Sequence, residues 1–138
     1  MRNKRRIMVC VTQQKSCRRL IEAGSALRRS EADELHVVHV FKENWRYFGQ
    51  LKEADALEYL FDAARDFGAE LSVIRSADIE GTLKKYVEKN RITVAVMGES
   101  NESTAQQNMI LRMQAQGLDK LQWHIVPLKG LQDPEETV

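Results

Sequence analysis

The chain has 138 residues and a formal net charge of +1, with 43% hydrophobic and 30% charged side chains. This balance is typical of a globular domain, and the length predicts a single domain with its own core. A nearly neutral charge does not favour binding to nucleic acid. The first apolar run, Ile7 to Val11, is too short for a signal peptide or a membrane span. We therefore expect a cytoplasmic protein that inserts into no membrane.

The two ends of the chain carry opposite charge. Basic residues gather in residues 1–5 and at Arg6, whereas Asp133, Glu135 and Glu136 make residues 131–138 acidic. We expect both ends to be solvated tails that flank one domain over residues 6–130.

Five short apolar runs, rich in β-branched residues, predict the buried strands of a parallel sheet. They are Arg6–Val11, Glu34–Val40, Ala69–Ile74, Thr93–Met97 and Trp123–Leu128. Pro127 favours an edge position for the last strand, because proline has no N–H to donate to a neighbour.

Apolar residues at helical spacing predict four helices between these strands. The stripes span Cys17–Leu27, Ala54–Phe67, Ile79–Val87 and Met109–Met113. Residues typical of helix starts and ends flank these stripes. We expect N-caps at Ser16, at Ser76 or Asp78, and at Ser103, and helix ends at Gly68 and Gly117.

Strict alternation of strands and helices predicts an α/β fold, a doubly wound parallel sheet of the Rossmann type with right-handed crossovers. The strand order expected for this fold class is 3-2-1-4-5. The connections then diverge between the first and fourth strands, which creates a crevice at their carboxyl ends. The loop at Thr12–Ser16 would face the loop at Gly98–Ser103 across that crevice.

Four segments resemble the universal stress protein superfamily. They are Ile7-Met-Val-Cys-Val, Arg18-Arg-Leu-Ile-Glu-Ala-Gly, Glu34-Leu-His-Val-Val-His-Val and Val94-Ala-Val-Met-Gly-Glu-Ser. The likeness is greatest to the stress-protein-like domain of potassium-sensing histidine kinases. The resemblance implies a five-stranded doubly wound sheet, dimerisation through the last strand, and a nucleotide site at the crevice.

Nucleotide-binding members of that superfamily place an Asp after the first strand and a G-x-x-G-x9-G-[ST] loop after the fourth. In this chain the Asp position falls near Thr12, and Gly98 matches the first glycine. Asn101 stands at the second glycine, and the third lies near Leu111. Because a side chain at a glycine position blocks close approach of backbone amides to phosphate, the resemblance implies a degenerate phosphate loop.

Two loops could still hold an anion. Hydroxyls of Ser100, Ser103 and Thr104, with the N-terminus of the fourth helix, are suitable donors, but Ser103 could equally serve only as a cap. Lys15-Ser16 precedes the first helix, as the Lys-Ser pair of a P-loop does, but the glycines of that motif are missing, so the match is weak. A solvated lysine beside a capping serine is the alternative interpretation.

An aromatic segment, Phe41–Phe48, follows the second strand and holds four aromatic residues in eight. It could pack over the end of the sheet. It could instead stack on a base or form a partner surface.

The sequence contains no arrangement typical of catalysis or of metal binding. His36 and His39 point to opposite faces of one strand, so they cannot share a metal. Cys10 and Cys17 lack C-x-x-C spacing and read as small buried hydrophobic residues. A hydrolase would need a base and usually a metal, and neither is visible. We therefore expect that this protein is not an enzyme.

The leading hypothesis is a regulatory stress-response domain that binds ATP, AMP or a cyclic dinucleotide at the crevice. The residues expected to line that site are Thr12, Gln13, Val40, Gly98, Ser100 and Asn101, with Val40 against the base. The alternative is a ligand-free module that forms a homodimer through the last strand or docks to a partner.

Overall fold

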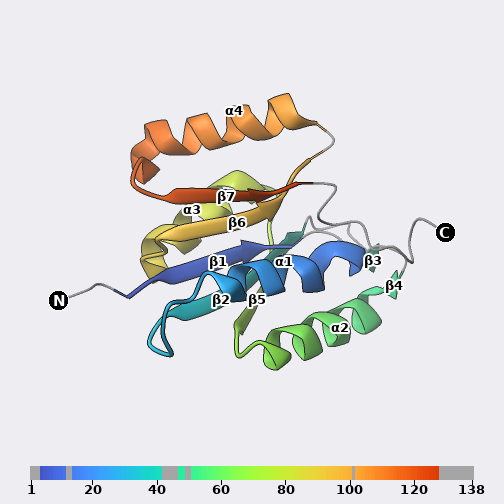
Figure 1. Cartoon of the computed structure of the whole chain (residues 1–138). Helices are drawn as coiled ribbons and strands as arrows, with labels where there is room; N and C mark the ends of the chain where they lie inside the picture. Colours follow the sequence, from blue (N-terminus) through green and yellow to red (C-terminus); the bar gives the residue numbers. More distant parts are fainter. Residues whose placement is uncertain (1–3, 12–13, 42–46, 49–50, 101, 128–138) are drawn as a thin grey trace.

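A sheet of five parallel strands, in the order β5-β2-β1-β6-β7, forms the centre of the molecule (Figure 1). The computed structural model describes residues 4–11, 14–41, 47–48, 51–100 and 102–127. The strands are β1 (Arg6–Cys10), β2 (Glu34–Phe41), β5 (Glu70–Arg75), β6 (Val94–Gly98) and β7 (Gln122–Val126). The predicted α/β class, the doubly wound sheet and the 3-2-1-4-5 order are confirmed, with strand bounds shifted by one or two residues.

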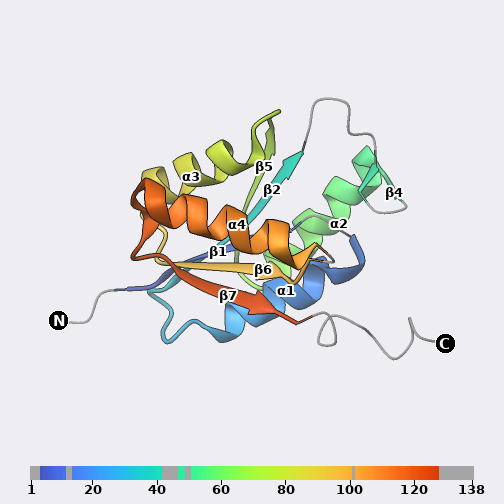
Figure 2. The same ribbon diagram turned by 90° about the horizontal axis from the view of Figure 1, so that it is seen from above.

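Two pairs of helices cover the sheet (Figures 1 and 2). One face packs against α1 (Gln14–Ala26) and α2 (Glu53–Asp66), and the other against α3 (Ile79–Asn90) and α4 (Ser103–Met113). A kinked turn, η1 (Gln114–Leu118), follows α4, and Gly117 within it has a φ of +103°. An antiparallel ribbon of β3 (Tyr47–Phe48) and β4 (Leu51–Lys52) precedes α2. The sequence did not predict this ribbon, since a strand of two residues has no readable period.

The alternation of side chains along each strand divides the core in two. Ile7 and Val9 of β1 face α1 and α2, where they join Ile21 and Leu60. Met8 of the same strand faces α3 and α4 with a second cluster. The buried members of that second cluster are Met8, Cys10, Val38, Val40, Leu83, Val87, Ile92, Ala95, Met113, Leu118 and Leu121.

Gly24 lets α1 approach β1 closely. A Cβ at this position would collide with the side chain of Val9 and lie 3.2 Å from Leu35. This contact explains why a glycine stands inside the apolar stripe of the helix.

The predicted helix ends are partly confirmed. The Asp78 carboxylate accepts from the Gly81 N–H at 2.9 Å and caps α3, and Gly68 follows α2 with a φ of +66°. The N-caps predicted at Ser16 and Ser103 are wrong. Ser16 lies inside α1, because the good helix formers Gln14 and Lys15 extend that helix toward its N-terminus. Ser103 is the first residue of α4, and the N-cap position belongs to Glu102.

The basic residues before β1 make specific contacts. The Arg5 N–H donates to the Asp33 carboxylate at 2.8 Å, and its guanidinium donates to the Leu27 carbonyl at 2.9 Å. The Lys4 ammonium lies 2.8 Å from the Glu34 carboxylate. Part of the basic cluster is therefore neutralised by the start of β2. No helix in the described part of the chain is long and apolar enough to cross a membrane.

Candidate functional site

A pocket of about 660 Å³ lies between α3 and α4, beside the carboxyl ends of β1, β2 and β6. This is the crevice where the sheet connections diverge, as predicted from the strand order. We call it the apolar pocket, because most of its walls are hydrocarbon or thioether. These walls are formed by Cys10, Val11, Val38, Val40, Ile79, Leu83, Met97, Ala105 and Met109.

The Gln106 side chain ties the loop after β6 to α4. Its amide nitrogen donates to the Gly98 carbonyl at 2.9 Å, and its amide oxygen accepts from the Ser100 N–H at 3.2 Å. We call this pair of hydrogen bonds the Gln106 clamp. It uses, within the protein, a backbone N–H that a phosphate loop would offer to its ligand.

A salt bridge links the two helices that border the apolar pocket. Arg112 of α4 donates to Glu80 of α3 through Nη2 at 2.8 Å and through Nε at 3.2 Å. These hydrogen bonds raise the pKa of the Arg112 guanidinium. The pair is of the bidentate type that fixes orientation as well as charge.

The Cys10 thiol forms part of the pocket wall. Burial raises its pKa to about 12, so the thiol is protonated at neutral pH. A protonated thiol is a poor nucleophile. Cys10 therefore contributes apolar surface rather than reactivity.

Three of the predicted site residues lie at this pocket. Val40 and Ser100 line it, and Gly98 lies beside it as an acceptor of the Gln106 clamp. Thr12, Gln13 and Asn101 lie outside the described residues, so their predicted roles stay predictions.

Three polar side chains of the pocket, Gln106, Arg112 and Glu80, escaped the sequence prediction. Gln106, Met109 and Met113 follow one another at spacings of three and four along α4. A glutamine in this stripe was therefore a readable sign of a polar group turned toward the sheet. No sequence pattern pairs Arg112 with Glu80, since these residues come from different helices.

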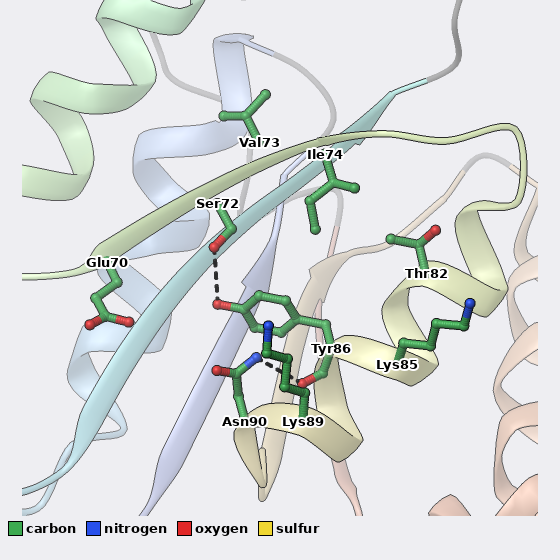
Figure 3. A pocket seen from close by; sticks show the side chains of 9 residues that line it. All are labelled: Glu70, Ser72, Val73, Ile74, Thr82, Lys85, Tyr86, Lys89 and Asn90. Carbon is green, nitrogen blue, oxygen red and sulfur yellow. Dashed lines mark hydrogen bonds between the residues drawn. The ribbon is translucent and has the colours of Figure 1, made fainter.

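A second pocket, of about 490 Å³, lies on the other flank of α3, against the edge strand β5 (Figure 3). We call it the polar pocket. Tyr86 stands at its centre, with its phenol 3.3 Å from the Ser72 hydroxyl. Its other lining residues are Glu70, Val73, Ile74, Thr82, Lys85, Lys89 and Asn90.

A chain of hydrogen bonds leads from the polar pocket into the sheet. Tyr86 Oη lies 2.9 Å from Nδ1 of His36, and Nε2 of His36 lies 3.0 Å from the Glu34 carboxylate. Hydrogen bonds from Lys4 and His36 lower the pKa of Glu34 to about 2, so this carboxylate is ionised and only accepts. His36 therefore donates to Glu34 through Nε2–H, while its Nδ1 contacts the Tyr86 hydroxyl and lies 3.4 Å from the Glu70 carboxylate. Each of these side chains is satisfied within the protein.

The prediction for the two strand histidines is confirmed. His36 is 3% exposed and bonds on the α3 face, whereas His39 is 2% exposed and its Nδ1 donates to the Val11 carbonyl at 2.9 Å. Burial lowers the pKa of His39. Among the residues that the structure describes, no group of three His, Cys, Asp or Glu side chains could hold a metal ion.

The aromatic segment is described only at its start. Phe41 is buried, stacks on His39 with ring centroids 5.7 Å apart, and carries the Arg75 guanidinium 5.4 Å from its ring centre. Residues 42–46 and the side chains of Tyr47 and Phe48 lie outside the described part of the chain. Whether the segment packs over the sheet or serves a ligand or partner thus stays a prediction.

No family model and no curated protein matches this sequence. Solved structures do match it. One is a hypothetical protein whose biochemical function was assigned from its structure, with a TM-score of 0.62, 13% identity, and coverage of 89% of this chain and 95% of that one. Another is a universal stress protein in complex with cAMP, with a TM-score of 0.58, 14% identity, and coverage of 90% and 96%.

This chain has the universal stress protein fold. Further universal stress proteins match it over most of its length, so the resemblance found in the sequence is confirmed for the fold. The same fold occurs inside an enzyme. A bacterial class III photolyase from Agrobacterium tumefaciens matches with a TM-score of 0.62 and 12% identity, over 92% of this chain and 26% of the photolyase. The universal stress protein fold alone therefore does not decide the function.

Proposed function

We propose that this chain is a non-catalytic, cytoplasmic regulatory domain that binds an adenine-containing ligand in the apolar pocket. The carrying observation is the coincidence of a pocket of about 660 Å³ with the point where the sheet connections diverge. Pockets of roughly 300–1,000 Å³ with mainly apolar walls are typical of small-molecule sites. Val40 and Leu83 offer the flat apolar surface that a base needs.

A solved structure supports the choice of ligand class. The universal stress protein described above was crystallised in complex with cAMP. ATP, AMP and cyclic dinucleotides are the other candidates for this chain, because all of them present an adenine or a similar base. Gln13, Thr12 and Asn101 belong to the proposed site through their positions in the sequence.

The non-catalytic part of the proposal rests on the pocket's chemistry. Cys10 is held protonated, and Arg112 and Glu80 neutralise each other. Gln106 bonds to the backbone rather than to a side chain that it could activate. These groups offer surface and shape to a ligand, but no activated nucleophile or base.

Thermal unfolding with added adenosine, AMP, cAMP, ATP or cyclic di-AMP tests the proposal. A ligand at 100 times its Kd should stabilise the protein by about 2.7 kcal/mol. Val40→Phe should abolish the shift by filling the pocket. Leu111→Phe adds similar bulk at a side chain of α4 that is 60% exposed, and should leave the shift intact. No shift with any of these ligands would end the proposal of binding, and sustained ATP turnover would end the non-catalytic part.

A homodimer through β7 is the second proposal. β7 pairs with β6 along one edge, and the Trp123 indole N–H is buried without a hydrogen-bond partner among the described residues. Pairing with another copy would extend the sheet and satisfy edge backbone groups. Light scattering at micromolar concentration should report a dimer, which His124→Glu should weaken by placing like charges at the shared edge. A monomeric wild-type protein would contradict this proposal.

A further inference from the structure

The loop after β6 uses its backbone N–H groups within the protein. The Glu99 N–H donates to the Val126 carbonyl at 2.8 Å, and the Ser100 N–H donates to Gln106 at 3.2 Å. The Glu102 N–H donates to the Ser100 hydroxyl at 3.0 Å. A phosphate cradle depends on unoccupied N–H groups that converge on one point. The N–H groups of Glu99, Ser100 and Glu102 therefore already have partners within the protein.

The charged side chains around the apolar pocket do not favour a phosphate either. Arg112 is the one cation among its described lining residues. Its Nε and Nη2 both donate to the Glu80 carboxylate. Glu80 and Glu102 place two carboxylates at the same rim. A triphosphate would have to displace Glu80 from Arg112 and lie beside both carboxylates. The two carboxylates would repel the negative charges of a triphosphate, which disfavours that ligand.

The remaining surface of the pocket is suited to a neutral ring system. Its apolar walls come from both sides, with Val38 and Val40 on the sheet and Leu83 and Met109 on the helices. Thioethers such as that of Met109 pack well against the edges of aromatic rings. The Ser100 hydroxyl and the carboxylates at the rim can accept hydrogen bonds from a sugar or an exocyclic amine.

We infer that the apolar pocket selects an uncharged, flat ligand of the nucleoside class and discriminates against nucleoside triphosphates, because the Gln106 clamp uses the Ser100 N–H and Glu80 engages Arg112, the one described cation of the lining. This inference rests on the proposed function, and it names the ligand class within it. Gln106 thus acts as the specificity-determining residue of the pocket.

Calorimetric titration of the full chain with adenosine, AMP and ATP tests the inference. The wild-type protein should bind adenosine at least tenfold more tightly than ATP, a difference of about 1.4 kcal/mol. Gln106→Ala frees the Ser100 N–H and should reduce this preference at least tenfold. Gln107→Ala, an exposed glutamine one position further along α4, is the matched control and should keep the wild-type preference.

A second variant keeps the test decisive if the loop of Gln106→Ala is disturbed. Glu80→Gln releases Arg112 without touching the loop, and should also shift the preference toward ATP. The melting temperature of each variant shows whether it is folded. Tighter binding of ATP than of adenosine by the wild-type protein would overturn the inference while leaving the proposed function in place. Binding of no nucleoside or nucleotide by any folded variant would remove the proposed function itself.

Discussion

The two flanks of α3 show two different uses of a surface hollow. On one flank, the apolar pocket is bordered by Leu83 and by hydrocarbon walls, and no described side chain fills the space between them. On the other, the polar pocket is organised around Tyr86, whose phenol is held by Ser72 and His36. The first hollow leaves apolar surface that a ligand can cover. In the second, Tyr86, Ser72 and Asn90 form hydrogen bonds within the protein, which is typical of a structural network.

The periodicity of α3 produces this difference. Leu83 and Val87 lie one turn apart and face the core, whereas Tyr86 and Lys89 are turned toward β5. One helix therefore presents an apolar stripe to one hollow and a polar stripe to the other. The comparison predicts that substitutions on the two stripes lower the stability of the protein for different reasons, by loss of apolar packing on one and by loss of hydrogen bonds on the other.

The largest effect is expected from Leu83→Ala. Leu83 is 4% exposed, and a buried Leu→Ala change costs about 2–5 kcal/mol of unfolding free energy. We expect the lower half of that range, because one side of Leu83 already borders open space and the added cavity is small. Urea denaturation measures the loss. Leu111→Ala, on the exposed side of α4, should change stability by less than about 0.5 kcal/mol. A similar loss in both variants would show that the apolar flank is not part of the core.

Tyr86→Phe should come next, with a loss of about 1–3 kcal/mol. The ring stays, but Nδ1 of the buried His36 loses its hydrogen bond with the Tyr86 hydroxyl. Ser72→Ala removes the longer contact, at 3.3 Å, and should cost less. Chemical denaturation of the two variants ranks them. If Ser72→Ala costs as much as Tyr86→Phe, the chain from Tyr86 to Glu34 does not organise the polar flank.

A smaller, pH-dependent effect is expected from Glu34. Its pKa is lowered from 4.5 to about 2 in the folded protein by Lys4 and His36. A lowered pKa means that the carboxylate's stabilisation is complete above pH 4.5 and disappears as the pH falls through about 2. Since the Glu34 side chain is 38% exposed, solvent screening limits this stabilisation to about 0.2–1 kcal/mol.

Stability measured between pH 5 and pH 2 checks the role of Glu34. Glu34→Gln should flatten the acid limb of the curve, and Glu88→Gln, at an exposed position of α3, should leave it unchanged. An unaltered acid limb in Glu34→Gln would contradict the ion pairing at the start of β2.

The cysteines give the smallest effect, on reactivity rather than on stability. Burial raises the pKa of both Cys10 and Cys17 to about 12, so neither should react quickly with a disulfide reagent near pH 8 in the folded protein. Cys10 lines the apolar pocket and Cys17 does not. A ligand in the pocket should therefore slow the labelling of Cys10 further, with Cys17 as internal reference. Rapid labelling of Cys10 with saturating ligand present would place that ligand elsewhere.

The sequence predicted the fold well because the signals of the fold are local. Alternating apolar runs such as the one from Ile7 to Val11 give a strand a readable period, and the stripes between them do the same for helices. The N-caps at Ser16 and Ser103 were wrong for a local reason as well. Several neighbouring polar residues could begin each helix, and which of them is the N-cap depends on where the first backbone hydrogen bonds of the helix form.

The site was predicted less completely than the fold. Val40, Gly98 and Ser100 lie at the apolar pocket because the carboxyl ends of neighbouring strands converge, and their role in ligand binding stays a prediction. Gln106 was overlooked although it lies in the apolar stripe of α4, and the Arg112–Glu80 pair was not found because its two residues come from different helices.

The sequence by itself determined where the crevice lies in this protein. Strand periodicity sets the parallel sheet, and the point at which its connections diverge sets the crevice beside Gly98. Only the tertiary structure decided what that crevice can hold. Val126, which accepts from the Glu99 N–H, belongs to β7, whereas Gln106 reaches back to Ser100 from the first turn of α4. The contact with β7 joins segments far apart in the chain, and such a contact leaves no period or spacing in a sequence.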